Sequence, residues 1–180
     1  PNSVQIYKIS RYARQLVTVL LTGEGADEIF AGYPRYKIPK ILHPLQRMPQ
    51  LMKEASASLL GLSSNHRFQQ LSAATTLSFD DVLIKNSKFV DDSLIKLLLK
   101  DTLLQDTTST RKKILNEAKS RFENWHQHLL YLELKTYLVS ILQRMDKMTM
   151  AAEVEGRVPF LDHTIVEWAS TLPLNLKMSL

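Results

Sequence analysis

The sequence predicts a predominantly α-helical chain with about one β-strand. Two observations lead to this prediction. The run from Leu16 to Leu21 is apolar without alternation, which is typical of a strand covered on both faces in a parallel sheet. Most of the remaining chain carries apolar residues at helical spacing, interrupted by prolines and polar loops. Its 180 residues are enough for one ordinary domain.

The first 36 residues are expected to form a helix, a strand and a second, short helix. We expect the first helix from Asn2 or Ser3 to about residue 15, because either residue can cap it. The strand over 16–21 ends in a turn that contains two glycines. A short helix over 26–31 follows, with Gly32 as a candidate for its C-cap. The pattern is therefore strand, glycine turn and helix.

Helices dominate the expected structure after residue 37, and no second convincing strand is predicted. Prolines punctuate this part, and Pro49 is expected to kink or break a helical pattern over 45–60. The other expected elements are a short helix over 93–100, a polar linker over 101–110, and one long or two abutting helices over 111–143. The last of these has an apolar face formed by Leu134, Leu138, Ile141 and Leu142.

Composition excludes several classes of function. The absence of cysteine rules out disulfides, thiolate metal sites and a cysteine nucleophile in this chain. No apolar run approaches the roughly 18 residues of a membrane span, and no signal pattern is present, so we expect a soluble, cytoplasmic protein without a membrane partner. The net charge of +5 is spread along the chain, without the basic stripe that nucleic acid requires. Both ends resemble cuts, so we expect a piece of a longer protein.

The glycine turn combines bare backbone with negative charge. Its sequence is Thr22-Gly23-Glu24-Gly25-Ala26-Asp27-Glu28. Free backbone N–H groups at a helix start can bind an anion, but the three carboxylates would repel a bare phosphate. A nucleotide with Mg²⁺ resolves the conflict, because Mg²⁺ is usually held by one or two carboxylates together with phosphate oxygens. The alternative is that the acidic residues only stabilise the first helical turn and the glycines only make the bend.

A second motif runs over residues 144–163, where charged side chains alternate with apolar ones. Its charged residues include Arg144, Asp146, Glu155, Arg157 and Asp162. One interpretation is an internal network of salt bridges with methionines filling the core. The other is that the basic groups bind a substrate carboxylate or phosphate, and the acidic groups an amine or a metal.

Together, the two motifs resemble the synthetase domain of the glutamine-hydrolysing asparagine synthetases. In that family a strand leads into Ser-Gly-Glu-Gly-x-Asp-Glu-Leu-Phe-x-Gly-Tyr-Pro-Arg-Tyr, and a later helix leads through Arg-x-Asp-x-Met-x-Met-Ala to Glu-x-Arg-Val-Pro-Phe-Leu-Asp. The match is strong over 16–36 and 134–173, with only a general likeness between them. Thr22 replaces the usual serine and keeps the hydroxyl, whereas Gly156 replaces valine or alanine and would cost up to about 1 kcal/mol if it were helical.

The resemblance implies an α/β parent fold of the pyrophosphatase-loop, nucleotide-binding kind, similar to adenine nucleotide α-hydrolases. It implies that aspartate attacks the α-phosphate of MgATP to give β-aspartyl-AMP and pyrophosphate, and that ammonia from glutamine then displaces AMP. Related β-lactam-forming synthetases tend to carry tyrosine at the position of Glu24, which favours asparagine synthesis here. The residues implied by position are Thr22, Gly23, Gly25 and Asp146 for ATP binding, Glu24, Asp27, Glu155 and Arg157 for catalysis, and Asp27 for Mg²⁺.

The resemblance also implies that residues 1–180 are a partial synthetase domain. The family's phosphate loop, catalytic lysine and glutaminase domain have no counterpart in this chain, so we expect the chain alone to bind ATP weakly or not at all and to lack turnover. The expected partners of the parent ligase are aspartate, ATP and glutamine-derived ammonia, and a homodimer is left open. Two alternatives also stay open: an ATP-dependent amidotransferase acting on another acid, and a non-catalytic relative used as an interaction module.

Overall fold

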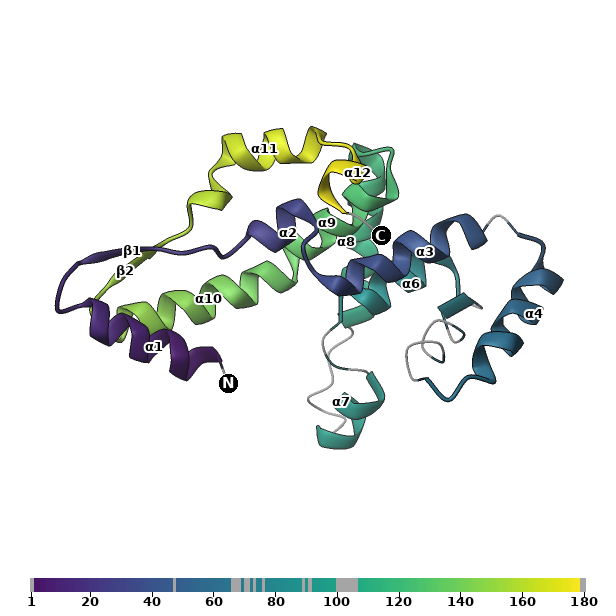
Figure 1. Ribbon diagram of the computed structural model, residues 1–180, viewed down its shortest axis with the longest axis horizontal. Helices are drawn as coiled ribbons and strands as arrows, with labels where there is room; N and C mark the ends of the chain where they lie inside the picture. Colours follow the sequence, from purple (N-terminus) through teal and green to yellow (C-terminus); the bar gives the residue numbers. More distant parts are fainter. Residues whose placement is uncertain are drawn as a thin grey trace. The chain divides into compact units, whose positions relative to one another are not determined.

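The computed structural model describes residues 2–46, 48–65, 69, 72, 74–75, 77–88, 90, 92–99 and 107–178. The described residues form two compact units, one within 2–33 and 122–178 and the other within 34–121. Helices predominate in both units, as predicted (Figure 1). In the part of the chain that is described, no helix has the length and apolar character needed to cross a membrane.

The first unit contains a pair of parallel strands. Its elements are α1 (Asn2–Ala13), β1 (Val19–Leu21), α2 (Ala26–Phe30), α9 (Trp125–Lys135), α10 (Tyr137–Met150), β2 (Glu155–Arg157), the 3-10 turn η3 (Pro159–Leu161), α11 (His163–Thr171) and α12 (Leu174–Lys177). Strands β1 and β2 pair with Leu20 opposite Gly156. Helix α10 runs along the pair, with α1 packed beside it (Figure 1).

The prediction of about one strand is wrong, because β2 is a second one. Glu155, Gly156 and Arg157 have low strand propensity, and they form a strand because their backbone pairs with a distant segment. The Glu155 N–H donates to the Thr18 carbonyl at 2.9 Å, and the Thr22 N–H donates to the Arg157 carbonyl at 2.9 Å. Gly156 is therefore extended rather than helical, and the helical cost does not apply.

Gly156 allows a close approach between β2 and α10. A Cβ atom at this position would lie 3.0 Å from Cε of Met145 and 3.1 Å from Cγ2 of Thr149. Both of those side chains are buried, so they have little room to move away. The absence of a side chain at Gly156 lets the strand lie directly on the helix.

Strand β1 is shorter and more exposed than predicted. It covers residues 19–21, and the prediction that the whole run 16–21 is covered on both faces is wrong. Leu16 is 77% exposed and Leu21 is 72% exposed. The reason is that the described sheet has two strands with α10 packed along them, so the outward-facing side chains of β1 have no cover.

The core of the first unit forms between α2, α9, α10 and β2. Its buried apolar side chains include Ile29, Leu129, Leu132, Leu138, Ile141, Met145 and Val154. The predicted apolar face is met in part: on α10, Leu138 and Ile141 are buried and Leu142 is partly buried, whereas Leu134 lies on the preceding helix α9. This core holds α10 beside the turn that follows β1.

The prediction of one long or two abutting helices over 111–143 is wrong, because three helices cover this range. Helix α8 (Thr107–Arg121) belongs to the second unit, whereas α9 and α10 belong to the first. Asn124 and Gln127 form a capping box that starts α9. Thr136 separates α9 from α10, with φ −122° and ψ −73°, and its hydroxyl donates to the Leu132 carbonyl at 2.7 Å.

The second unit is helical throughout its described part. Its elements are the 3-10 turn η1 (Pro34–Tyr36), α3 (Lys37–Leu45), α4 (Gln50–Gly61), α6 (Phe79–Asn86), α7 (Asp92–Leu98) and α8. Helix α6 packs against α3 and α8, around the buried residues Leu42, Ala74 and Val82. The break at Pro49 is confirmed, because this residue caps the start of α4.

The remaining predictions for the second unit are met in part. The helix expected over 93–100 is α7, and residue 100 lies outside the described residues. Residues 101–106 of the expected linker also lie outside them, and the chain is helical from Thr107 onward.

Candidate functional site

The turn between β1 and α2 has a backbone shape that requires glycine at one position. Gly25 has φ +91°, in the left-handed region, and a Cβ atom there would lie 2.3 Å from Cδ2 of Leu161. Gly23 differs, because no atom lies within 4 Å of the position of its Cβ. Leu161 belongs to η3, which therefore packs directly on the glycine turn. Of the two glycines, Gly25 defines the shape of the turn.

Aromatic side chains hold η3 and α11 against α2. The ring of Phe30 makes edge-on contacts with Phe160 at 6.4 Å and with Trp168 at 6.3 Å between centroids. These contacts explain the Pro-Phe-Leu part of the second motif as support for the turn. Trp168 remains largely exposed on its other side.

The three carboxylates of the turn have different surroundings. Glu28 is 1% exposed and accepts a hydrogen bond from the Tyr33 hydroxyl at 2.8 Å. Burial raises the pKa of the Tyr33 phenol far above its ordinary value, and the bond to Glu28 raises it further. Glu28 therefore belongs to the core of the first unit, whereas Glu24 is partly buried and Asp27 is exposed.

Glu24 lies where its ionised form is disfavoured. Burial raises the pKa of its carboxyl group above the ordinary value, and the nearby charge of Arg144 lowers it by less than burial raises it. The charges of Glu28 and Asp27 raise this pKa as well. Three clustered negative charges are therefore only partly compensated by the protein itself.

Asp27 takes its position because residue 32 is glycine. A Cβ atom at Gly32 would lie 2.0 Å from Oδ1 of Asp27. The residue in the left-handed conformation at the end of α2 is Ala31, with φ 59°. The predicted C-cap role thus falls to Ala31, and Gly32 makes room for the Asp27 carboxylate.

The second motif meets the turn through α10 and β2. The Thr22 hydroxyl donates to Sδ of Met145 at 3.2 Å, across 123 positions of the chain. The Thr22 N–H is bonded to Arg157 of β2, as described above. The structure thus brings the two motifs together at Thr22.

The charged residues of the second motif separate into two groups. Arg157 donates from Nε to Oε1 of Glu155 at 2.9 Å, and both side chains are exposed on β2. Asp146 is exposed on α10, and among the described residues no hydrogen bond or ion pair links its side chain to the turn. Arg144 is different, because its Nε is buried without a hydrogen-bond partner in the described structure. Sequence reasoning noted this charge between apolar residues but did not select it for the site.

Other features of the described residues lie apart from these motifs. No three His, Asp or Glu side chains in the described ranges are placed to hold a metal ion together. Burial lowers the pKa of His126 to about 4.

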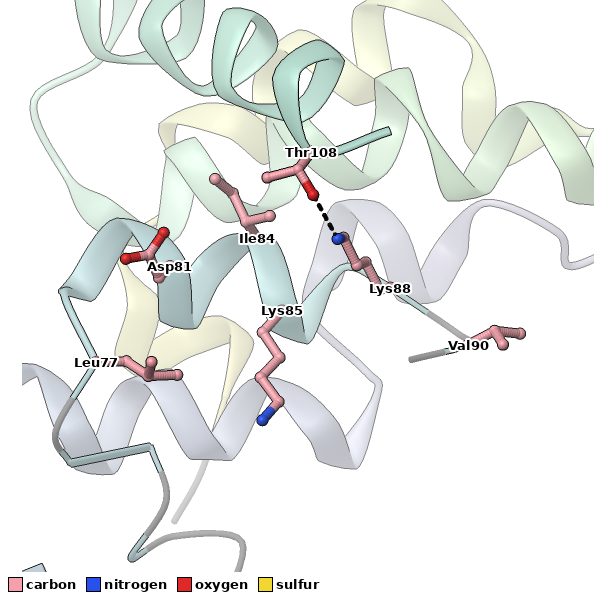
Figure 2. Close-up of a pocket in the computed structure, with 7 residues that line it drawn as sticks. All are labelled: Leu77, Asp81, Ile84, Lys85, Lys88, Val90 and Thr108. Carbon is pink, nitrogen blue, oxygen red and sulfur yellow. Dashed lines mark hydrogen bonds between the residues drawn. The ribbon is translucent and has the colours of Figure 1, made fainter. Parts of the chain in front are cut away.

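In the second unit, a pocket of about 490 Å³ contains none of the predicted site residues (Figure 2). It is lined by Leu77, Asp81, Ile84, Lys85, Lys88, Val90 and Thr108, with Nζ of Lys88 donating to Oγ1 of Thr108 at 2.7 Å.

Comparison with known proteins extends the resemblance to the whole chain. The asparagine synthase family profile matches residues 1–180. Asparagine synthetase (glutamine-hydrolysing) 1 of Bacillus subtilis is 33% identical over 183 residues, covering 98% of this chain and 28% of that protein. A putative asparagine synthetase of Mycobacterium tuberculosis is 30% identical over 181 residues, covering 99% of this chain and 28% of that protein. No solved structure gives a significant match.

A more distant relative carries a different name. It is amidase chry2 of Gibberella zeae, which is 24% identical over 193 residues and covered to 27% of its length. The chain therefore spans between a quarter and a third of the length of these relatives.

The shape of the turn leads to a prediction for its two glycines. We expect Gly25→Ala to lower the free energy of unfolding by about 1–3 kcal/mol, because alanine is strained at positive φ and its Cβ would collide with Leu161. Gly23→Ala is the matched control and should change the free energy of unfolding by no more than about 0.5 kcal/mol. Urea unfolding followed by circular dichroism measures both, and equal effects of the two substitutions would contradict the assignment.

The raised pKa of Glu24 leads to a prediction with a defined sign. A carboxyl group whose pKa is raised in the folded state begins to oppose folding when the pH rises above its ordinary pKa, and opposes it fully above the raised pKa. We therefore expect Glu24→Gln to raise the urea midpoint at pH 7. This gain should vanish below pH 4.5, the ordinary pKa of the group, where both states are protonated. If the urea midpoint of Glu24→Gln at pH 7 is unchanged or lower, the ionised Glu24 carboxylate does not oppose folding.

Proposed function

The chain belongs to the asparagine synthase family, and on this premise we propose that it is part of the synthetase domain of an enzyme that makes asparagine. In the proposed reaction the β-carboxylate of aspartate attacks the α-phosphate of MgATP, which forms β-aspartyl-AMP and releases pyrophosphate. Ammonia derived from glutamine then attacks the activated carbonyl, and AMP leaves. The chain alone corresponds to a fraction of its relatives' length, so the activity is proposed for the full-length protein.

The observation that carries this proposal is the meeting of the two motifs at Thr22. The hydroxyl of this residue contacts Met145 and its N–H is bonded to Arg157. The acidic turn and the basic residues of the second motif therefore lie in one unit, on neighbouring segments. Adenylyl transfer depends mainly on positioning and on compensating charge, and this arrangement supports both.

We assign the phosphates of ATP to the backbone N–H groups of Gly23 and Gly25. The N–H and the hydroxyl of Thr22 donate to Arg157 and Met145 here, so Thr22 is proposed to contact ATP with its hydroxyl turned away from Met145. Helix α2 has only five residues, so its dipole contributes little, and positive charge must come from elsewhere. Asp146 is proposed as a further residue of the nucleotide site. The pair Glu155 and Arg157 is proposed to act on the reacting groups from β2.

Glu24 and Asp27 are the residues proposed to hold Mg²⁺. Their carboxylate oxygens are the donors that this ion prefers. Burial raises the pKa of Glu24 the most, and the charges of Glu28 and Asp27 raise it further. A cation would relieve this repulsion between the carboxylates, which supports the assignment. When bound, Mg²⁺ would neutralise the negative charge of the phosphates. Glu28 is not assigned to the metal, because its carboxylate is buried against Tyr33.

A second candidate function is the ATP-dependent amidation of a different acid. The relative named amidase chry2 supports this alternative, because a similar domain occurs in a protein that is named for a different activity. Fold and turn geometry do not select the acid.

The reaction is tested by the release of AMP and pyrophosphate from MgATP by the full-length protein. We expect AMP release to depend on aspartate, and to fall about 100-fold or more in Asp27→Asn, because a carboxylate proposed to hold the Mg²⁺ of MgATP is lost. Glu167→Gln, an exposed acidic position on α11, serves as the control and should retain the activity. AMP release with another acid but not with aspartate would support the second candidate instead.

A further inference from the structure

Arg144 on α10 is a positively charged residue that no contact in the described structure explains. Its Nε atom is buried and has no hydrogen-bond acceptor there. Guanidinium groups stay charged in proteins and cannot escape burial by losing a proton. Buried donors in folded proteins nearly always have a partner, so this one points to a group that binds from outside.

Arg144 lies close to the glycine turn. Its neighbour Met145 is buried and accepts the hydrogen bond from Thr22 at 3.2 Å. The charge of Arg144 also acts on the carboxyl group of Glu24. However, no ion pair joins Arg144 to Glu24 or to another carboxylate in the described ranges. The charge is therefore near the site without being neutralised there.

The other basic residues of the second motif have different surroundings. Arg157 is exposed and forms an ion pair with Glu155. Lys147 is exposed one turn further along α10, where water can solvate it. Arg144 thus combines partial burial with the lack of an acidic partner, which distinguishes it from its two neighbours.

We propose that Arg144 is a further binding residue of the site. Its guanidinium binds an anionic oxygen group of a substrate that lies at the glycine turn. This inference rests on the function proposed above. The planar fork of a guanidinium fits a phosphate or a carboxylate through two parallel hydrogen bonds. Such a bond would satisfy the buried Nε and neutralise the charge. Both substrates carry groups of this kind: the phosphates of ATP and the carboxylates of aspartate.

The test compares three variants of the full-length protein: Arg144→Met, Arg144→Lys and, as the matched control, Lys147→Met. Calorimetry gives the Kd for MgATP, and steady-state assays give the KM for aspartate. We expect Arg144→Met to raise either the Kd for MgATP or the KM for aspartate by about tenfold or more, since a bidentate charged contact is lost. Arg144→Lys should raise the same constant by a smaller factor, because lysine keeps the positive charge but lacks the planar fork of the guanidinium. Lys147→Met should bind both as the unaltered protein does.

The two readouts separate the sources of the oxyanion. A raised Kd for MgATP assigns Arg144 to a phosphate, whereas a raised KM for aspartate at an unchanged Kd assigns it to a carboxylate. Unchanged values of both in Arg144→Met would overturn the inference. If Arg144→Met does not fold, Arg144→Lys decides in the same way. If the unaltered protein neither binds MgATP nor releases AMP, the proposed function fails together with the inference.

Discussion

The parallel pairing of β1 with β2 is the interaction on which the rest of the site depends. Two backbone hydrogen bonds, at Glu155 and at Thr22, join segments that are more than 130 positions apart in the chain. They fix the point at which β1 ends and place the glycine turn beside α10. The same pairing leads the chain into η3, where Leu161 closes over Gly25. The turn is therefore shaped from both sides by the second motif.

Burial divides the charges that the sequence places together. Among the acidic residues of the turn, Glu28 is bonded to Tyr33 in the core, whereas Glu24 and Asp27 remain accessible to a cation. Among the basic residues, Arg157 is paired at the surface, and Arg144 is held near the turn without an acidic partner. This division gives the proposed site two negative groups for a metal and one positive group for an anion.

The features that could be predicted from the sequence are those that depend on neighbouring residues in the chain. Strand, glycine turn and short helix follow from an apolar run and two glycines, and the break at Pro49 follows from the missing N–H of proline. Strand β2 could not be predicted, because Glu-Gly-Arg has little strand propensity and pairs with a remote partner. The separate burial of Glu28 and Arg144 could not be predicted either, because it depends on how α2, α9 and α10 pack. Gly32 was assigned to a helix end, although its role is steric and depends on the Asp27 side chain.

The central claim is that the glycine turn binds the phosphates of a nucleotide through a divalent cation held by its two accessible carboxylates. A crystal structure of the full-length protein with Mg²⁺ and a non-hydrolysable ATP analogue tests it most directly. The account predicts a metal ion at about 2.0–2.1 Å from an oxygen of Glu24 or Asp27, with the triphosphate over Gly23 and Gly25. A nucleotide bound elsewhere, with both carboxylates in solvent and distant from the metal, would contradict it.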